Sequence, residues 1–85
     1  MSRRIILEGD TIDHGGEVVC KASVDRIDGR GIACMGDAVV CRRHGHTRIA
    51  EGCSHASIDG RPIALEGHRT ECGACLIASG AASIG

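Results

Sequence analysis

The apolar residues of this chain fall into short groups that alternate with glycine-rich polar phrases. No stretch keeps a helical period over three turns, and the 13 glycines are spread throughout the sequence. Short apolar runs bounded by glycine are typical of strands and turns. The last ten residues, LIASGAASIG, also have a strand-and-turn pattern. The pattern predicts a nearly all-β fold.

One phrase occurs twice in the chain. Residues 23–37 and 54–68 are identical at eight of fifteen positions, at an offset of 31. Both copies contain IDGR, in which Asp-Gly lies between short apolar stretches, and this is the strongest short-range signal of a two-residue β-hairpin. A unit repeated within so short a chain buries its apolar face only against its own copies. We therefore expect hairpins that pack on one another.

A second phrase begins with glycine and follows each hairpin. Its copies read GDTIDHGG over residues 9–16, GDAVVCRRHGH over 36–46 and GHRTECGA over 67–74. We expect one domain over residues 1–85, with pseudo-repeats of about 9–35, 36–66 and 67–85 and no fused second domain.

Metal-capable side chains occupy the same place in each copy of this phrase. Five residues after the leading glycine stand His14, Cys41 and Cys72. Under pseudo-threefold symmetry, equivalent residues converge about one axis. The sequence therefore predicts that three arms meet at one point, where residues of these types can bind an ion.

The composition explains why an ion is needed. The chain has 85 residues and no Phe, Tyr or Trp, so it lacks the side chains that supply most buried area in small cores. It has six cysteines, but only IIL follows the basic start MSRR, too few apolar residues for a signal peptide. We expect synthesis and folding in the cytoplasm, and therefore a metal site in preference to a disulfide framework.

The charge and composition also exclude several function classes. The net charge is −1, and charges of both signs are scattered along the chain, which argues against strong electrostatic binding to nucleic acid or anionic lipid. The missing aromatic residues remove the stacking platforms of single-strand binders. No apolar run approaches the length of a membrane span.

The glycine-rich phrases contain more metal-capable residues than one site needs. Structural zinc takes four ligands from Cys and His, and the candidates are His14, Cys41, His44, His46, His68 and Cys72. Four other cysteines lie in or beside apolar stretches, where we expect small buried hydrophobes: Cys20, Cys34, Cys53 and Cys75. His55 is expected on the surface. CGAC at 72–75 has the spacing of a thioredoxin-like redox pair but lacks the βαβ context.

Together, GDTIDHGG, GDAVVCRRHGH, IDGRPIALEGH and ECGACLIASG resemble the PAAR-repeat proteins of the bacterial type VI secretion system. The resemblance implies a cone-shaped, pseudo-threefold β domain with a metal site near its vertex. It also implies a zinc-binding tip that caps and sharpens the trimeric valine-glycine-repeat spike, with one copy per trimer. Such a tip aids membrane puncture, is ejected with the spike, and delivers effectors. The family name refers to Pro-Ala-Ala-Arg, from which GIAC departs, whereas PIAL keeps Pro62 and Ala64.

The resemblance also implies a ligand set. The family's zinc is held by three His and one Cys, and His14, His44 and Cys72 stand in matching places. His68 is our choice for the third His, with His46 as its competitor. Cys41 could displace one of them to give a set of two Cys and two His. Zinc is expected, and iron stays open.

The residues of the chain allow two other functions. The first is a small zinc-dependent hydrolase with an open His-rich site, for which the available general bases are Asp10, Asp13, Asp37 and Glu71. The second is a metal module that binds nucleic acid, which the charge and composition disfavour. A site closed by four protein ligands leaves no position for a reactive water, so we expect no enzymatic activity.

Overall fold

The computed structural model describes residues 3–19, 26–27, 29–80 and 82–84. All regular structure in these residues is β-strand, which confirms the predicted all-β fold. They include no helix that is long and apolar enough to cross a membrane. The strands are β1 (Arg3–Arg4), β2 (Thr11–Ile12), β3 (Gly16–Val19), β4 (Arg26–Ile27), β5 (Arg30–Gly31), β6 (Ala38–Cys41), β7 (Gly45–Arg48), β8 (Ser57–Ile58), β9 (Arg61–Pro62), β10 (Leu76–Ile77) and β11 (Ser83–Ile84).

A closed ring of three backbone hydrogen bonds marks the centre of the fold. The N–H of Ile6 donates to the carbonyl of Ala64 (3.0 Å), Ala64 donates to Ala33 (2.9 Å), and Ala33 donates to Ile6 (2.9 Å). All three residues are fully buried. Each comes from a different part of the chain, so the ring defines a pseudo-threefold axis and confirms the predicted symmetry.

The three segments that form this ring are copies of one phrase. They read RRIILEGD from Arg3, RGIACMGD from Arg30 and RPIALEGH from Arg61. Sequence reasoning aligned only the last two. Around the axis, single antiparallel bridges join each segment to the next, at Leu7–Ile32, Cys34–Ile63 and Leu65–Ile5.

Each segment ends in a turn at a glycine. Gly9, Gly36 and Gly67 have φ of 88°, 92° and 91°, a region that residues with a Cβ atom rarely adopt. The chain then turns into the second phrase, where another set of residues pairs around the axis. These pairs are Val18–Val39, Ile49–Thr70 and Leu76–Ile12. They enclose the main buried cluster together with the ring residues.

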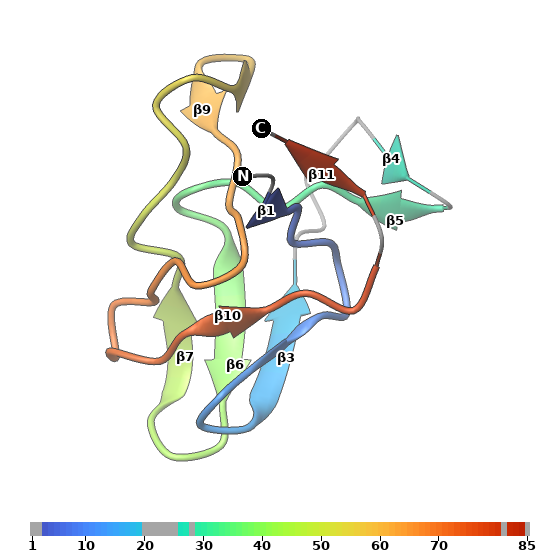
Figure 1. The fold of residues 1–85 in the computed structure, drawn as a ribbon. Coiled ribbons are helices and arrows are strands. Elements are labelled where there is room, and N and C mark those ends of the chain that lie inside the picture. The colour runs from blue at the N-terminus through green and yellow to red at the C-terminus, as the bar shows by residue number, and fades with distance from the viewer. Residues whose placement is uncertain (1–2, 20–25, 28, 81, 85) are drawn as a thin grey trace.

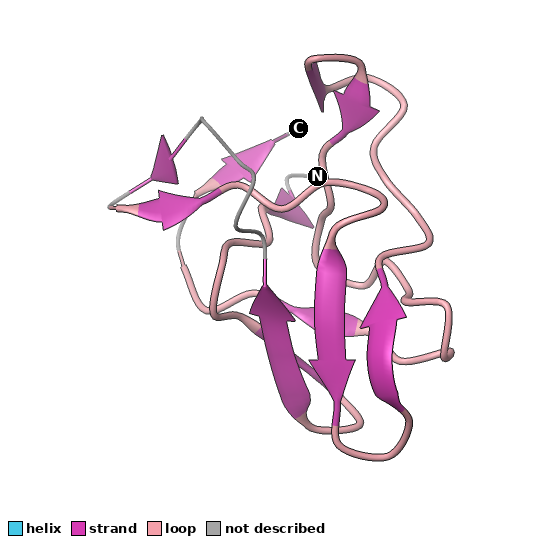
Figure 2. Cartoon of the chain, turned by 180° about the vertical axis from the view of Figure 1, so that it is seen from behind, coloured by secondary structure: helices cyan, strands magenta, loops and turns pink. Residues whose placement is uncertain are grey.

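The molecule has two different ends. At one end, β4–β5, β8–β9 and the terminal pair β1–β11 form three short antiparallel units (Figure 1). Asp59 and Gly60 both have positive φ, as the predicted Asp-Gly hairpin requires, whereas Asp28 of the first copy lies outside the described residues. At the other end, β3, β6 and β7 form a three-stranded sheet whose turns point away from these units (Figure 2).

Candidate metal centre

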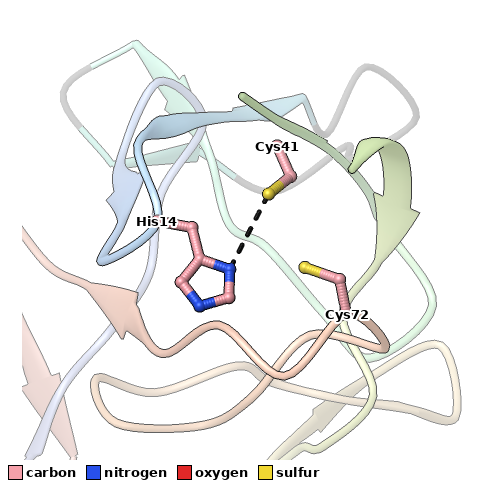
Figure 3. Close-up of side chains that lie close together, drawn as sticks. All are labelled: His14, Cys41 and Cys72. Atoms are coloured by element: carbon pink, nitrogen blue, oxygen red, sulfur yellow. Dashed lines mark hydrogen bonds between the residues drawn. The ribbon is translucent and has the colours of Figure 1, made fainter. Parts of the chain in front are cut away.

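His14, Cys41 and Cys72 come together at the end away from the hairpins. One ligand atom from each lies within 4.8 Å of the others. His14 lies in the turn between β2 and β3, Cys41 ends β6, and Cys72 lies in the turn before β10. They are the equivalent residues of the three glycine-led phrases, so the predicted convergence is present (Figure 3).

The three side chains differ in burial and in hydrogen bonding. Cys41 is buried, and its Sγ lies 3.9 Å from Nδ1 of His14. His14 and Cys72 are half-buried. The hydroxyl of Thr70 lies 3.0 Å from Sγ of Cys72, and this contact, more than any other, lowers the pKa of the Cys72 thiol. A lower pKa favours the thiolate, which is the form of cysteine that binds metals.

His44 stands beside this group. It lies in the turn between β6 and β7, and its side chain is exposed. Its ring centroid is 5.7 Å from that of His14, with the two rings tilted by 51°. His44 therefore lies next to one member of the group, although it is not itself within the group.

The structure does not bring His68 into the group. Nδ1 of His68 accepts the backbone N–H of Leu65 at 3.0 Å. This is the position that carboxylates occupy in the other two repeats, where Asp10 accepts the N–H of Leu7 and Asp37 that of Cys34, each at 2.8 Å. Of the predicted set of His14, His44, His68 and Cys72, the group contains His14 and Cys72. It also contains Cys41, which sequence reasoning kept as an alternative.

His46 is also outside the group. It pairs with Val40 across β6 and β7, and both residues are exposed. Because side chains alternate between the two faces of a strand, His46 points to the face opposite Cys41. His55 is exposed, as expected.

The remaining cysteines lie elsewhere. Cys34 is buried in the second apolar cluster, whereas Cys53 and Cys75 are half-buried, so the expectation of fully buried thiols is met only by Cys34. Cys20 lies outside the described residues. The five described cysteines form no disulfide with one another.

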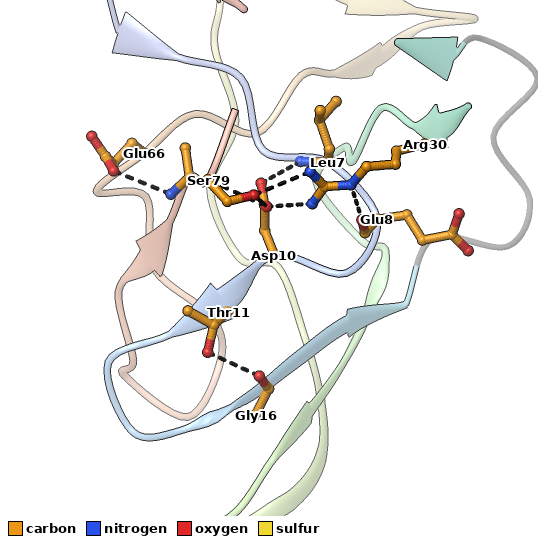
Figure 4. Close-up of polar contacts among 9 residues, drawn as sticks. Leu7, Glu8, Asp10, Thr11, Gly16, Arg30, Glu66 and Ser79 are labelled. Atoms are coloured by element: carbon orange, nitrogen blue, oxygen red, sulfur yellow. Dashed lines mark hydrogen bonds and ion pairs between the residues drawn. The ribbon is translucent and has the colours of Figure 1, made fainter. Parts of the chain in front are cut away.

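Sequence reasoning missed the shared role of Asp10, Asp37 and His68. Asp10 is fully buried and accepts hydrogen bonds from Leu7, Arg30 and Ser79 (Figure 4). Asp37 accepts from Arg61 at 2.9 Å. The signal was present, because each residue directly follows the positive-φ glycine of its repeat.

These contacts also bear on the proposed general bases. Asp10 and Asp37 are engaged by arginines, and Oδ1 of Asp13 accepts the backbone N–H of Cys75 at 3.0 Å. Three of the four carboxylates named for a hydrolase therefore have structural partners.

A family model described as PAAR motif matches residues 8–78 of the chain. The matched range contains His14, Cys41 and Cys72 as well as His44. The comparison with curated proteins gave no match.

Proposed function

Because this chain belongs to the PAAR-motif family, we propose that it is the zinc-bound tip of a type VI secretion spike. One observation carries the proposal: equivalent residues of three pseudo-repeats meet at the end of the axis that lies away from the short hairpin units. That arrangement suits a rigid point more than a catalytic cleft.

We infer that the ion is held by His14, Cys41, Cys72 and His44. Two thiols and two imidazoles are a common donor set of structural zinc, and paired thiolates favour zinc over harder ions. Three of these donors already lie within 4.8 Å of one another, and the ring of His44 lies beside that of His14. Bound zinc would act as a structural cross-link between the repeats.

The energetic need for this cross-link follows from the core. The buried cluster consists of Ile, Val, Leu, Ala and Cys side chains without aromatic residues. Structural zinc contributes about 10–16 kcal/mol in small peptides. That energy is as large as the total stability of an ordinary domain, about 5–15 kcal/mol.

The partner would be the trimeric spike protein, bound through the hairpin end. The three short strand pairs there present backbone edges about a pseudo-threefold axis. Exposed edges can pair with strands of another chain. A trimer with a true threefold axis offers one such surface, so one copy of this chain should bind each trimer.

Elemental analysis of the purified chain tests the metal site. We expect one zinc per chain, lost on substitution of His14, Cys41 or Cys72 by alanine and weakened by His44→Ala. His46→Ala and His55→Ala are matched controls and should keep full zinc. Loss of zinc in His68→Ala, with His44→Ala unchanged, would contradict the proposed ligand set.

Native mass spectrometry with a purified spike trimer tests the tip role. We expect one chain per trimer, and binding of three copies or of none would overturn the proposal. Failure here would leave the metal result standing, because the two measurements probe opposite ends of the molecule.

A further inference from the structure

Two of the three converging side chains are cysteines, from different repeats. Cys41 ends β6, and Cys72 lies in the turn before β10. Their Sγ atoms belong to the group whose ligand atoms all lie within 4.8 Å of one another. Figure 3 shows both sulfurs turned toward the same space. In a disulfide the two sulfurs lie about 2.05 Å apart, so the side chains must move closer for the bond to form.

We propose that Cys41 and Cys72 are a covalent modification site: without the ion and in the presence of a small disulfide oxidant, they form a reversible disulfide. The ion and the disulfide compete for the same two sulfurs. This inference rests on the metal site of the proposed function, but not on the spike-tip role.

The reaction balances with glutathione disulfide as the oxidant. The Cys72 thiolate attacks one sulfur of the oxidant and displaces one glutathione thiolate, which leaves a mixed disulfide on Cys72. The Cys41 thiolate then attacks Sγ of Cys72 and displaces the second glutathione. Two protein thiols are oxidised to one disulfide, and one glutathione disulfide is reduced to two glutathiones, with the two protons released by the protein thiols taken up by the glutathione thiolates.

Burial sets the order of these two steps. Cys72 is half-buried in a turn and can be reached by a small oxidant, whereas Cys41 is 1% exposed. Cys41 is also held in the central strand of the sheet, where it pairs with both Gly16 and Gly45. The accessible cysteine therefore reacts first, and the fixed one resolves the intermediate.

The other described cysteines do not belong to this group. Cys34 and Cys53 pack in the second apolar cluster, near the hairpin end. Cys75 is three residues from Cys72, but its backbone N–H is tied to Asp13. The disulfide should therefore form selectively between Cys41 and Cys72, the two apical thiols.

The zinc-bound and the disulfide-linked states would cross-link the metal-binding end of the molecule in different ways. Zinc joins all the converging repeats, whereas the disulfide joins only the second and third and leaves His14 without its partners. A chain that moves from a reducing to an oxidising compartment would exchange one cross-link for the other and release its ion.

Thiol mapping on the full chain tests the proposal. Reduced protein is divided into a zinc-loaded sample and a chelator-treated sample, and both are exposed to glutathione disulfide. Remaining thiols are alkylated, and tandem mass spectrometry distinguishes Cys41 from Cys34 and Cys72 from Cys75. We expect the Cys41–Cys72 linkage to dominate in the chelated sample and to fall at least tenfold with zinc.

Variants make the result decisive. Cys75→Ser should still lose two thiols on oxidation, as the wild type does. Cys72→Ser should form no intramolecular linkage at Cys41. Alkylation of both apical thiols in the chelated sample, stable glutathione adducts without linkage, or a statistical mixture of pairings would each overturn the proposal.

The same experiment separates this inference from the metal site. Zinc bound at one per chain, with no linkage in the chelated sample, would contradict the disulfide proposal and leave the metal site standing. Linkage formed equally with and without added zinc would overturn the proposed competition and also count against the metal site.

Discussion

His68 accepts the backbone N–H of Leu65 through Nδ1. It does so at the corner of the repeat, directly after the positive-φ glycine, where the other two repeats use a carboxylate. The corner also contains an arginine, because Arg3 donates to the carbonyl of Glu66 at 2.7 Å. In the first repeat, Arg30 makes the matching bond to the carbonyl of Glu8 and also reaches a carboxylate. In the third repeat, the arginine is therefore present, but a histidine stands where the other two repeats have an aspartate.

Replacing His68 by Asp should complete this corner. Asp accepts the same N–H and adds a negative charge near Arg3, so we expect the free energy of unfolding to rise by about 0.5–1 kcal/mol, as for partly exposed ion pairs. Urea denaturation at pH 7.5 measures the change. His68→Asn, which restores the acceptor without the charge, is the matched control and should not gain this increment.

The stability of the wild-type chain should fall in mild acid because of His68. Burial, aided by the positive charge of Arg3, lowers the pKa of this imidazole below its ordinary value of 6.5. The unfolded chain therefore binds more protons than the folded chain between the lowered pKa and 6.5. The stabilisation is complete above 6.5 and is lost as the pH falls through the folded-state pKa.

Denaturation of wild type and His68→Asn at pH 7.5 and 5.5, at equal metal loading, isolates this contribution. The comparison cancels the titration of the metal ligands, which both proteins share. The wild type should lose more stability than the variant, and an equal loss in both would assign the acid sensitivity to other groups.

The strand type and the symmetry could be predicted because they depend on local patterns. Asp59-Gly60 specifies its hairpin through positive φ, and spaced glycines exclude helices. The first copy of the repeated phrase was harder to find, because no Asp-Gly turn precedes RRIILEGD, although it is identical to RPIALEGH at five of eight positions. Its role appears only when Ile6 closes the ring with Ala33 and Ala64.

The ligand group could be predicted only in part. The equivalence of His14, Cys41 and Cys72 follows from their spacing after glycine, and the structure brings them together. Residue type alone could not separate His68 from these residues, because an imidazole serves equally well as a ligand or as a turn acceptor. That choice depends on Leu65, whose N–H needs a partner where the chain turns.

Gly16 should tolerate no side chain. It has φ of 145°, and a Cβ atom there would lie 2.0 Å from the carbonyl oxygen of Val40 in the adjacent strand. Gly16→Ala must push β3 away from β6. We therefore expect the free energy of unfolding to fall by about 3 kcal/mol or more, as for strained backbone combined with overpacking.

Gly60→Ala is the matched control for this prediction. Gly60 also has positive φ, at 79°, but a Cβ atom there meets nothing within 4 Å. Gly60→Ala should lower the free energy of unfolding by only about 1 kcal/mol, mainly because of backbone strain. Thermal denaturation compares the two variants, and equal losses would show that the close contact with Val40 has no energetic weight.

Thr70→Val should weaken metal binding without changing the fold. The equivalent residues of the other repeats are Ile12 and Val39, so valine suits the site in shape. The substitution removes the hydroxyl that lies 3.0 Å from Sγ of Cys72, which raises the pKa of that thiol, and it also removes an acceptor for the N–H of Ala74. We expect zinc affinity to fall about 10–100-fold, as on loss of a hydrogen bond to a ligand. Stability without metal should fall by about 1 kcal/mol.

Competition with a chromophoric chelator measures the affinity, and the ultraviolet absorbance of the thiolate follows the Cys72 titration. Thr11→Val is the matched control, because it removes a hydroxyl that donates to the carbonyl of Gly16 at 2.9 Å rather than to a sulfur. That variant should keep wild-type affinity. A Thr70→Val protein that binds zinc as tightly as Thr11→Val, with an unchanged thiol titration, would show that the hydroxyl does not tune Cys72.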